Sequence, residues 1–276
     1  MSIRMIAVDL DGTLLASDSV TVPEENIRAL RRAAERGAEI VLASGRSLVM
    51  MEDAAEQLGC VDYAVSALGA VVTDRRTGRR LAERELTPEQ RRAAMEVLRP
   101  YGPLVEVYCG SRIYVERGEL ERRPPVSGFD FLRFRYDDRV DGLEAALGER
   151  TVEKLDVDFI PDLGALEAIR AGLAALGGLN VLAYPRHLQM EISRAGATKS
   201  WGIQALCAHL GIEAREVLAL GDSDNDLDLL SWAGCSVAMA NGSPLARQAA
   251  DMVTASNDEG GVARAVEALM DRIGNG

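Results

Sequence analysis

The sequence predicts an α/β fold in which a parallel sheet is interrupted by an inserted α+β segment. Apolar runs of strand length alternate with helical patterns from the N-terminus to about residue 81, which is the order that βαβ units require. The same alternation returns near the C-terminus, whereas the middle of the chain follows a different pattern. We therefore expect a core domain built from 1–81 and 188–276 and an inserted α+β domain at 82–187.

The expected core elements follow from apolar periodicity and from the residues that end each run. Gly37 closes the first helical pattern and suits a helix C-cap, because glycine readily adopts the left-handed conformation. Before the insertion we expect strands at 5–8, 39–43 and 63–66 and helices at 23–36 and 48–58. After it we expect helices at 201–210, 226–233 and 262–273 and strands at 217–220 and 236–239.

The inserted segment carries hairpin and helix signals of its own. Thr87 and Pro88 predict a helix start, because threonine caps helices and proline suits the first helical position. Cys109-Gly110 separates two alternating runs, which is typical of a hairpin. We expect strands at 104–108, 112–116, 155–160, 181–184 and 188–192 and helices at 140–147 and 165–176.

Composition excludes several classes of protein. The chain has 276 residues, of which 47% are hydrophobic, and a formal net charge of −12, which argues against a nucleic-acid or anionic-membrane partner held by a basic surface. No apolar run approaches the ~18 residues of a membrane helix, and the first residues are typical of a buried strand rather than of a signal peptide. The four cysteines form no C-x-x-C pair. We expect a soluble, cytoplasmic protein with reduced thiols and leave its oligomeric state open.

Three polar clusters each follow an expected strand. They are DLDGT at 9–13, SGR at 44–46 and GDSDND at 221–226. In an open parallel sheet the carboxyl ends of the strands form the edge where ligands bind. Taken singly, the first cluster also suits an ordinary turn and the second an ordinary helix cap. Their shared placement favours a common site, in which the helix start after Ser44 can present backbone N–H groups to a phosphate.

The third cluster superficially resembles a calcium loop but fails the test for one. An EF-hand needs glycine at loop position six and glutamate at position twelve, and counting from Asp222 these positions hold Leu227 and Ala233. If Asp9 and Asp222 converge at one sheet edge, their repulsion favours a bound divalent cation. Oxygen-only ligands beside a phosphate site favour Mg²⁺ over zinc.

Lysine is rare in this chain. Of 31 basic residues only Lys154 and Lys199 are lysines, and all the others are arginines. Lys199 precedes the helix expected at 201–210, so its ammonium can reach the edge that carries the polar clusters. A lysine at a helix start is usually solvated, but a compact ammonium is not interchangeable with a guanidinium. Lys154 has no role that the sequence reveals.

These residues together resemble a known family. DLDGTLL at 9–15, ASGR at 43–46, Lys199 and GDSDND at 221–226 stand in the order and rough spacing of the four motifs of the haloacid dehalogenase (HAD) superfamily. The VAMAN segment at 237–241 and the NDEGGV segment at 257–262 are similar to those of the Cof-type sugar-phosphate phosphatases. The resemblance implies a Rossmann-like core with an inserted cap domain, and it spans essentially the whole chain.

The resemblance also implies a phosphoaspartyl mechanism. Asp9 would be the nucleophile, and Asp11 would be the general acid for the leaving alcohol and then the base that activates water. Asp222 would bind Mg²⁺ together with Asp9 and the backbone carbonyl of Asp11, and Asp226 would support the metal from the second shell.

The remaining motif residues are implied to bind the phosphoryl group or the substrate. This set comprises Ser44, Gly45, Arg46, Lys199 and Asn225. Leu68 departs from the family pattern, because relatives often have asparagine there. Residues for leaving-group recognition are expected in the inserted domain, where Glu106, Tyr108, Arg112, Arg186 and His187 are polar candidates.

We therefore expect a Mg²⁺-dependent phosphatase that hydrolyses small phosphomonoesters such as sugar phosphates. Two alternatives stay open at this point. A phosphomutase of sugar phosphates would retain the phosphoryl group within the substrate, and a non-catalytic sugar-phosphate sensor would bind without turnover. The intact acid pair of Asp9 and Asp11 disfavours the sensor.

Overall fold

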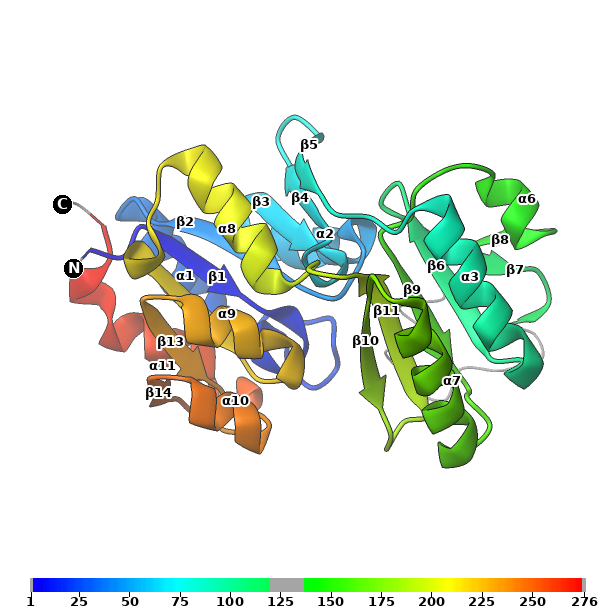
Figure 1. Ribbon diagram of the computed structural model, residues 1–276. Coiled ribbons are helices and arrows are strands. Elements are labelled where there is room, and N and C mark those ends of the chain that lie inside the picture. Colours follow the sequence, from blue (N-terminus) through cyan, green and yellow to red (C-terminus); the bar gives the residue numbers. More distant parts are fainter. Residues whose placement is uncertain (1, 120–136, 275–276) are drawn as a thin grey trace. The chain divides into compact units, whose positions relative to one another are not determined.

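The computed structural model describes residues 2–119 and 137–274, which form two compact units (Figure 1). The first unit comprises Met1–Glu83 and Thr198–Gly276, and the second is Arg84–Ala197. Each unit contains its own sheet and hydrophobic core.

The first unit is built on an eight-stranded sheet in the order β14-β13-β12-β1-β2-β3-β4-β5. The strands from β14 to β3 run parallel, and β4 and β5 are joined antiparallel to that edge. Their bounds are β1 Met5–Val8, β2 Glu39–Ala43, β3 Val61–Ser66, β4 Val71–Asp74, β5 Arg79–Glu83, β12 Val217–Gly221, β13 Cys235–Ala238 and β14 Met252–Val253. The mixed α/β fold with a largely parallel sheet confirms the predicted class.

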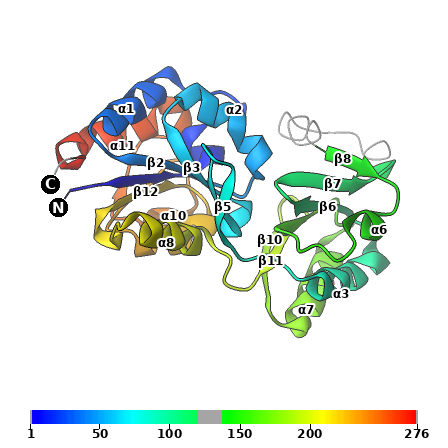
Figure 2. The ribbon, with the colours of Figure 1, turned by 90° about the horizontal axis from the view of Figure 1, so that it is seen from above.

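Helices cover both faces of this sheet (Figure 2). On one face lie α1 (Glu24–Glu35), α2 (Leu48–Leu58) and α11 (Gly261–Ala268); on the other lie α8 (Lys199–Leu210), α9 (Leu227–Trp232) and α10 (Pro244–Ala249). In β1, Ile6 and Val8 contact the first helix layer, and Met5 and Ala7 contact the second. Burial on both faces explains why the parallel strands are continuously apolar.

The second unit contains a six-stranded sheet in the order β10-β11-β9-β6-β7-β8, with helices on one face. Its strands are β6 Leu104–Cys109, β7 Arg112–Glu116, β8 Asp137–Val140, β9 Lys154–Asp158, β10 Leu179–Tyr184 and β11 Gln189–Arg194. Its helices are α3 (Pro88–Leu98), α6 (Leu143–Leu147) and α7 (Leu163–Leu176). Thr87 caps α3, because its hydroxyl accepts from the backbone N–H of Gln90, whose side chain in turn accepts from the N–H of Thr87.

The opposite face of the second sheet carries a buried polar network. Lys154 is 1% exposed, and its ammonium lies 3.0 Å from the carboxylate of Asp156 and also pairs with Glu191. Tyr108 donates to Asp156 at 2.7 Å and Tyr184 donates to Glu191 at 2.6 Å. The lysine to which the sequence assigned no role therefore pairs with two carboxylates inside the second unit.

The structure differs from the expected domain boundaries. The core was expected to resume at residue 188, but β11 pairs with β10 and β9 of the second sheet, so the division falls between Ala197 and Thr198. The first division, after Glu83, lies two residues beyond the expected one.

Several short elements were missed or misplaced by sequence analysis. The β4–β5 hairpin, α10 and β14 were not expected, and β14, Met252–Val253, is too short to show a period. Residues 140–147 contain the end of β8 and then α6, not one helix, because Gly142 lies in the left-handed region with φ of 78°.

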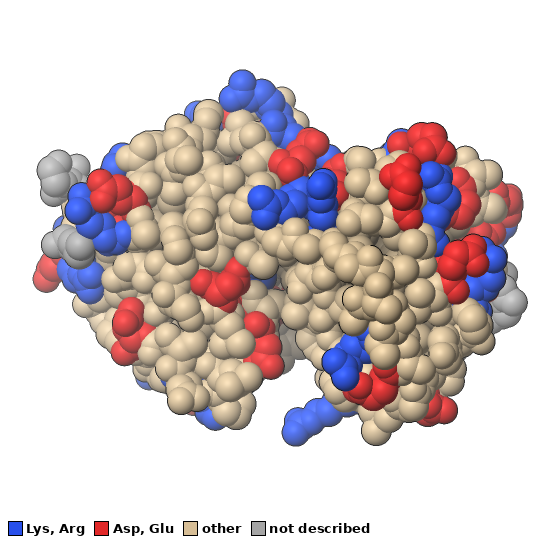
Figure 3. All heavy atoms as spheres, viewed as in Figure 1, with Lys and Arg blue, Asp and Glu red and all other residues tan. Residues whose placement is uncertain are grey.

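The surface in Figure 3 shows acidic and basic side chains interspersed, with no broad basic area on the face in view. Arg92, for example, lies 3.6 Å from Glu89 and 2.9 Å from Glu149. Among the described residues, no helix combines the length and the apolar character needed to cross a bilayer.

Candidate active site

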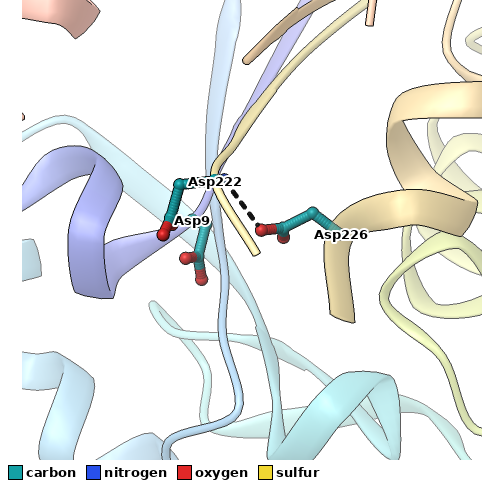
Figure 4. Close-up of side chains that lie close together, drawn as sticks. All are labelled: Asp9, Asp222 and Asp226. Atoms are coloured by element: carbon teal, nitrogen blue, oxygen red, sulfur yellow. Dashed lines mark hydrogen bonds between the residues drawn. The ribbon is translucent and has the colours of Figure 1, made fainter. Parts of the chain in front are cut away.

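Three aspartates converge at the carboxyl edge of the first sheet (Figure 4). Asp9 follows β1, Asp222 follows the neighbouring strand β12, and Asp226 lies in the turn that leads into α9. One carboxylate oxygen of each lies within 4.8 Å of the others. The parallel pairing of β1 with β12 thus brings together residues more than two hundred positions apart, as the strand-end pattern predicts.

Lys199 joins two of these carboxylates. Its ammonium donates to Asp9 Oδ1 and to Asp226 Oδ1, both at 2.7 Å, and the side chain is fully buried. Thr198 positions it, because the threonine hydroxyl caps α8 by accepting from the N–H of Trp201. Burial alone lowers the pKa of Lys199, but the charges of Asp226 and Asp9 outweigh it and hold that pKa well above its ordinary value.

The site is short of positive charge. Burial, together with the charges of Asp226 and Asp222, raises the pKa of Asp9 well above its ordinary value despite the attraction of Lys199. Burial and the charge of Asp226 likewise raise the pKa of Asp222 to about 6. Three carboxylates facing one ammonium leave negative charge uncompensated, and their oxygens are the donors that a hard divalent cation prefers.

Asp226 has both oxygens engaged within the protein. Besides accepting from Lys199 through Oδ1, it accepts through Oδ2 from the backbone N–H groups of Asp222 and Ser223, each at 3.0 Å. It therefore ties the Asp222 loop to the lysine. The amide oxygen of Asn225 accepts from the hydroxyl of Ser223 at 2.9 Å, so Asn225 lies beside this loop.

The loop after Asp9 makes a wide turn at residues 10–14, with hydrogen bonds that span five residues. Gly12 has φ of 77°, and a Cβ at that position would lie 2.5 Å from Asp222 Oδ2, so glycine is needed for both conformation and space. Thr13 donates to Asp222 Oδ1 at 2.8 Å. No role for Thr13 follows from the sequence alone, although it lies within the DLDGT motif at 9–13.

Three asparagines hold the backbone of this loop. Asn241 donates to the Gly12 carbonyl at 2.8 Å, Asn26 to that of Leu14 at 3.2 Å and Asn257 to that of Leu15 at 2.9 Å. Asn241 and Asn257 belong to the VAMAN and NDEGGV segments. The sequence offered no chemistry for these segments, and the structure shows that they brace the loop that carries Asp11.

The second motif lies at the end of β2. Ser44 is buried, and its hydroxyl accepts from the N–H of Arg46 at 3.2 Å; Gly45 lies between them, half-buried. The backbone carbonyl of Ser44 accepts from the N–H of Leu68 at 3.1 Å, and Leu68 has φ of 59°, a conformation that costs a leucine about 1–2 kcal/mol. A Cβ on Gly69 would overlap the Thr198 carbonyl oxygen, so this strained turn joins the Ser44 loop to the start of α8.

Arg46 contacts Asp11. Its Nε donates to Asp11 Oδ2 at 2.8 Å and its Nη2 to Asp11 Oδ1 at 2.6 Å. The resemblance implied that Arg46 binds the phosphoryl group or the substrate. In the structure its guanidinium instead contacts Asp11, the proposed acid and base. No sequence pattern reveals this pairing, because a long arginine side chain has too many reachable partners.

A sheet edge that concentrates carboxylates and a buried lysine, with a serine directly after the neighbouring strand β2, is the arrangement expected of a HAD-type hydrolase. A family model described as haloacid dehalogenase-like hydrolase matches residues 6–266, so the chain belongs to this family.

Individual relatives agree with this assignment. Phosphatase YwpJ of Bacillus subtilis is 31% identical, over 97% of this chain and 100% of its own length. The 5-amino-6-(5-phospho-D-ribitylamino)uracil phosphatase YcsE of the same organism is 26% identical, over 96% and 95%. A crystal structure of a haloacid dehalogenase-like hydrolase from Bacteroides thetaiotaomicron superimposes with a TM-score of 0.85 at 28% identity, covering 97% of this chain and 99% of that one. The chain is thus a phosphatase of the HAD family.

Proposed function

We propose that this phosphatase is Mg²⁺-dependent and hydrolyses small phosphomonoesters through a phosphoaspartate on Asp9. One observation carries the proposal: Asp9 and Asp222 lie at one sheet edge with a single buried ammonium, and burial together with the neighbouring carboxylates raises the pKa of each. Such a site favours a divalent cation and an attacking carboxylate held in a fixed orientation.

The donor set fits Mg²⁺. Asp9, Asp222 and the backbone carbonyl of Asp11 would hold the ion, and Asp226 would keep the Asp222 loop in place through its two backbone contacts. When bound, the ion neutralises charge on the carboxylates and on the phosphoryl oxygens, which is the main demand of phosphoryl transfer.

In the first half of the reaction, a carboxylate oxygen of Asp9 attacks phosphorus. The bond from phosphorus to the ester oxygen breaks, and the leaving alkoxide takes a proton from Asp11. Lys199 orients Asp9 through its bond to Oδ1. Ser44, the backbone N–H of Gly45 and the ammonium of Lys199 would attract the equatorial phosphoryl oxygens.

In the second half, water attacks the phosphorus of the phosphoaspartate. Asp11 accepts a proton from that water, the bond from phosphorus to the Asp9 oxygen breaks, and inorganic phosphate leaves. Asp9 returns as a carboxylate and Asp11 as an acid, so protons and charge balance over one turnover.

We propose an alkyl phosphomonoester, such as a sugar phosphate or a related metabolite, as the substrate class. The name of the relative YcsE, a phosphatase of a phosphorylated ribitylamino compound, supports a phosphate carried on a polyol chain. We also propose a cytoplasmic location, which is supported by the four cysteines being thiols rather than disulfides.

A phosphate-release assay tests this function. Purified protein is incubated with glycerol 2-phosphate, a hexose 6-phosphate and p-nitrophenyl phosphate, in Mg²⁺ and in excess EDTA. We expect release of inorganic phosphate that EDTA abolishes and added Mg²⁺ restores. Isomerisation of a labelled hexose bisphosphate without release of phosphate would show a phosphomutase instead, and tight phosphate binding without turnover would show a sensor.

Binding of Mg²⁺ is expected to depend on pH in a defined direction. The pKa of Asp222 is raised to about 6, above its unfolded value of about 3.9, so the ionised carboxylate destabilises the metal-free fold as pH rises through 6. Mg²⁺ binds the ionised carboxylate and restores the stability that ionisation removes. Below pH 6, protons compete with Mg²⁺ for this carboxylate. Saturating Mg²⁺ should therefore raise the Tm by on the order of 5 °C at pH 8 and much less at pH 5.

Thermal unfolding with and without Mg²⁺ at the two pH values measures this difference. Asp222→Asn should remove the Mg²⁺ effect at both, whereas Asp224→Asn, at an exposed carboxylate in the same loop, should keep it. Equal Mg²⁺ stabilisation at pH 5 and pH 8 would contradict binding through Asp222.

A further inference from the structure

Arg46 holds Asp11 with a two-point contact. Nε and Nη2 of the guanidinium each donate to a different oxygen of the carboxylate, at 2.8 and 2.6 Å. Two parallel bonds fix the tilt of a carboxylate as well as its distance, which the single point charge of a lysine cannot do. In the described part of the chain, no other side chain is hydrogen-bonded to the Asp11 carboxylate.

The guanidinium is itself anchored by groups outside the chemistry. Nη2 also donates to the carbonyl of Ser19 at 2.8 Å, and Nη1 donates to that of Met50 at 3.4 Å. The Arg46 side chain is 4% exposed, whereas that of Asp11 is 38% exposed. A buried, multiply bonded arginine therefore restrains a half-exposed aspartate on a glycine-containing loop.

We propose that Arg46 is a positioning residue for Asp11: it sets the carboxylate for proton transfer and does not bind the phosphoryl group. This inference rests on the proposed function, in which Asp11 is the acid and base. The two guanidinium nitrogens that face Asp11 are committed to it, so binding of a phosphoryl oxygen by them would leave Asp11 unrestrained. Arg46 should therefore matter only in steps that need Asp11.

Two esters with different leaving groups distinguish the steps that need Asp11 from those that do not. An alkoxide needs a proton as it departs, whereas 2,4-dinitrophenolate leaves as an anion. For Arg46→Gln we expect kcat on glycerol 2-phosphate to fall by about 10²-fold with KM changed little, since general acid–base catalysis contributes about 10²–10⁴-fold. The burst of dinitrophenolate from 2,4-dinitrophenyl phosphate, measured by rapid quench in Mg²⁺, should slow by less than about threefold.

The Arg46→Lys variant is the control for a folding defect in Arg46→Gln. It keeps the positive charge but loses the two-point contact, so we expect a near-native Tm, an intermediate kcat on glycerol 2-phosphate and the same near-normal burst. A phosphoryl ligand would behave otherwise: its loss would raise KM for both esters, slow the burst and weaken inhibition by inorganic phosphate. A purely structural residue would lower the Tm and affect both esters equally. Either pattern would overturn the inference.

A double-mutant cycle completes the test. If Arg46 acts through Asp11, the variant that combines Arg46→Gln with Asp11→Asn should be no slower on glycerol 2-phosphate than Asp11→Asn alone. Additive losses would refute the positioning role. If Asp11→Asn itself retains wild-type kcat on this ester, the proposed acid and base assignment fails, a result distinct from failure of the positioning role alone.

Discussion

Replacement of Asp9 by asparagine should abolish turnover and at the same time stabilise the metal-free protein. The amide lacks the anionic oxygen that attacks phosphorus, and loss of a covalent nucleophile lowers kcat by on the order of 10⁵-fold or more. The measurement is kcat on p-nitrophenyl phosphate in saturating Mg²⁺.

The expected rise in stability of Asp9→Asn follows from loss of the buried negative charge of Asp9. Burial and neighbouring carboxylates raise the pKa of Asp9 well above its unfolded value, so its contribution to stability is present when it is protonated and is lost as pH rises through its folded pKa. At pH 8 in EDTA, Asp9→Asn should therefore raise the Tm. Lys199 keeps Asp226 as a partner in this variant.

Asp11→Asn is the matched comparison. It removes a carboxylate from the same loop, but one that already pairs with Arg46, so the Tm should not rise in the same way. Wild-type turnover by Asp9→Asn would refute the nucleophile assignment, and a lower Tm in EDTA at pH 8 would refute the charge argument.

The architecture of the site could be predicted because its residues follow apolar strands. Asp9 and Asp222 directly follow β1 and β12, and carboxyl ends of neighbouring parallel strands must meet at one edge. Lys199 could be predicted because a lysine is unusual in this chain. These inferences need only strand order and residue type.

The contacts that orient the site could not be predicted in this way. The partner of Arg46 depends on the path of a flexible side chain, and the role of Thr13 depends on a turn whose hydrogen bonds span five residues.

The domain boundary after Ala197 was missed for a different reason. The alternation of apolar residues at 189–194 shows that one face of the strand is buried, but it does not show which sheet the strand joins. Lys154 and Asp156 alternate with apolar residues as solvent-facing side chains do, yet they are buried.

Removal of the Lys199 ammonium should harm both stability and catalysis. Lys199→Met leaves Asp9 and Asp226 without their shared partner in a buried setting, which costs about 3–5 kcal/mol when one member of a buried ion pair is lost. Loss of a donor near the transferring phosphoryl group lowers kcat by a further ~10²–10³-fold. Urea denaturation in EDTA and steady-state kinetics in Mg²⁺ measure the two effects.

Lys154→Met provides a control that separates the charge of the site from burial of a lysine in general. Both lysines are 1% exposed and each pairs with two carboxylates, so in EDTA both variants should be destabilised by similar amounts. Because the proposed ion binds beside Asp9, Mg²⁺ should restore part of the stability of Lys199→Met beyond its effect on wild type. Lys154→Met should gain no such excess. Equal Mg²⁺ gains in the two variants would contradict a metal site at the edge that Lys199 occupies.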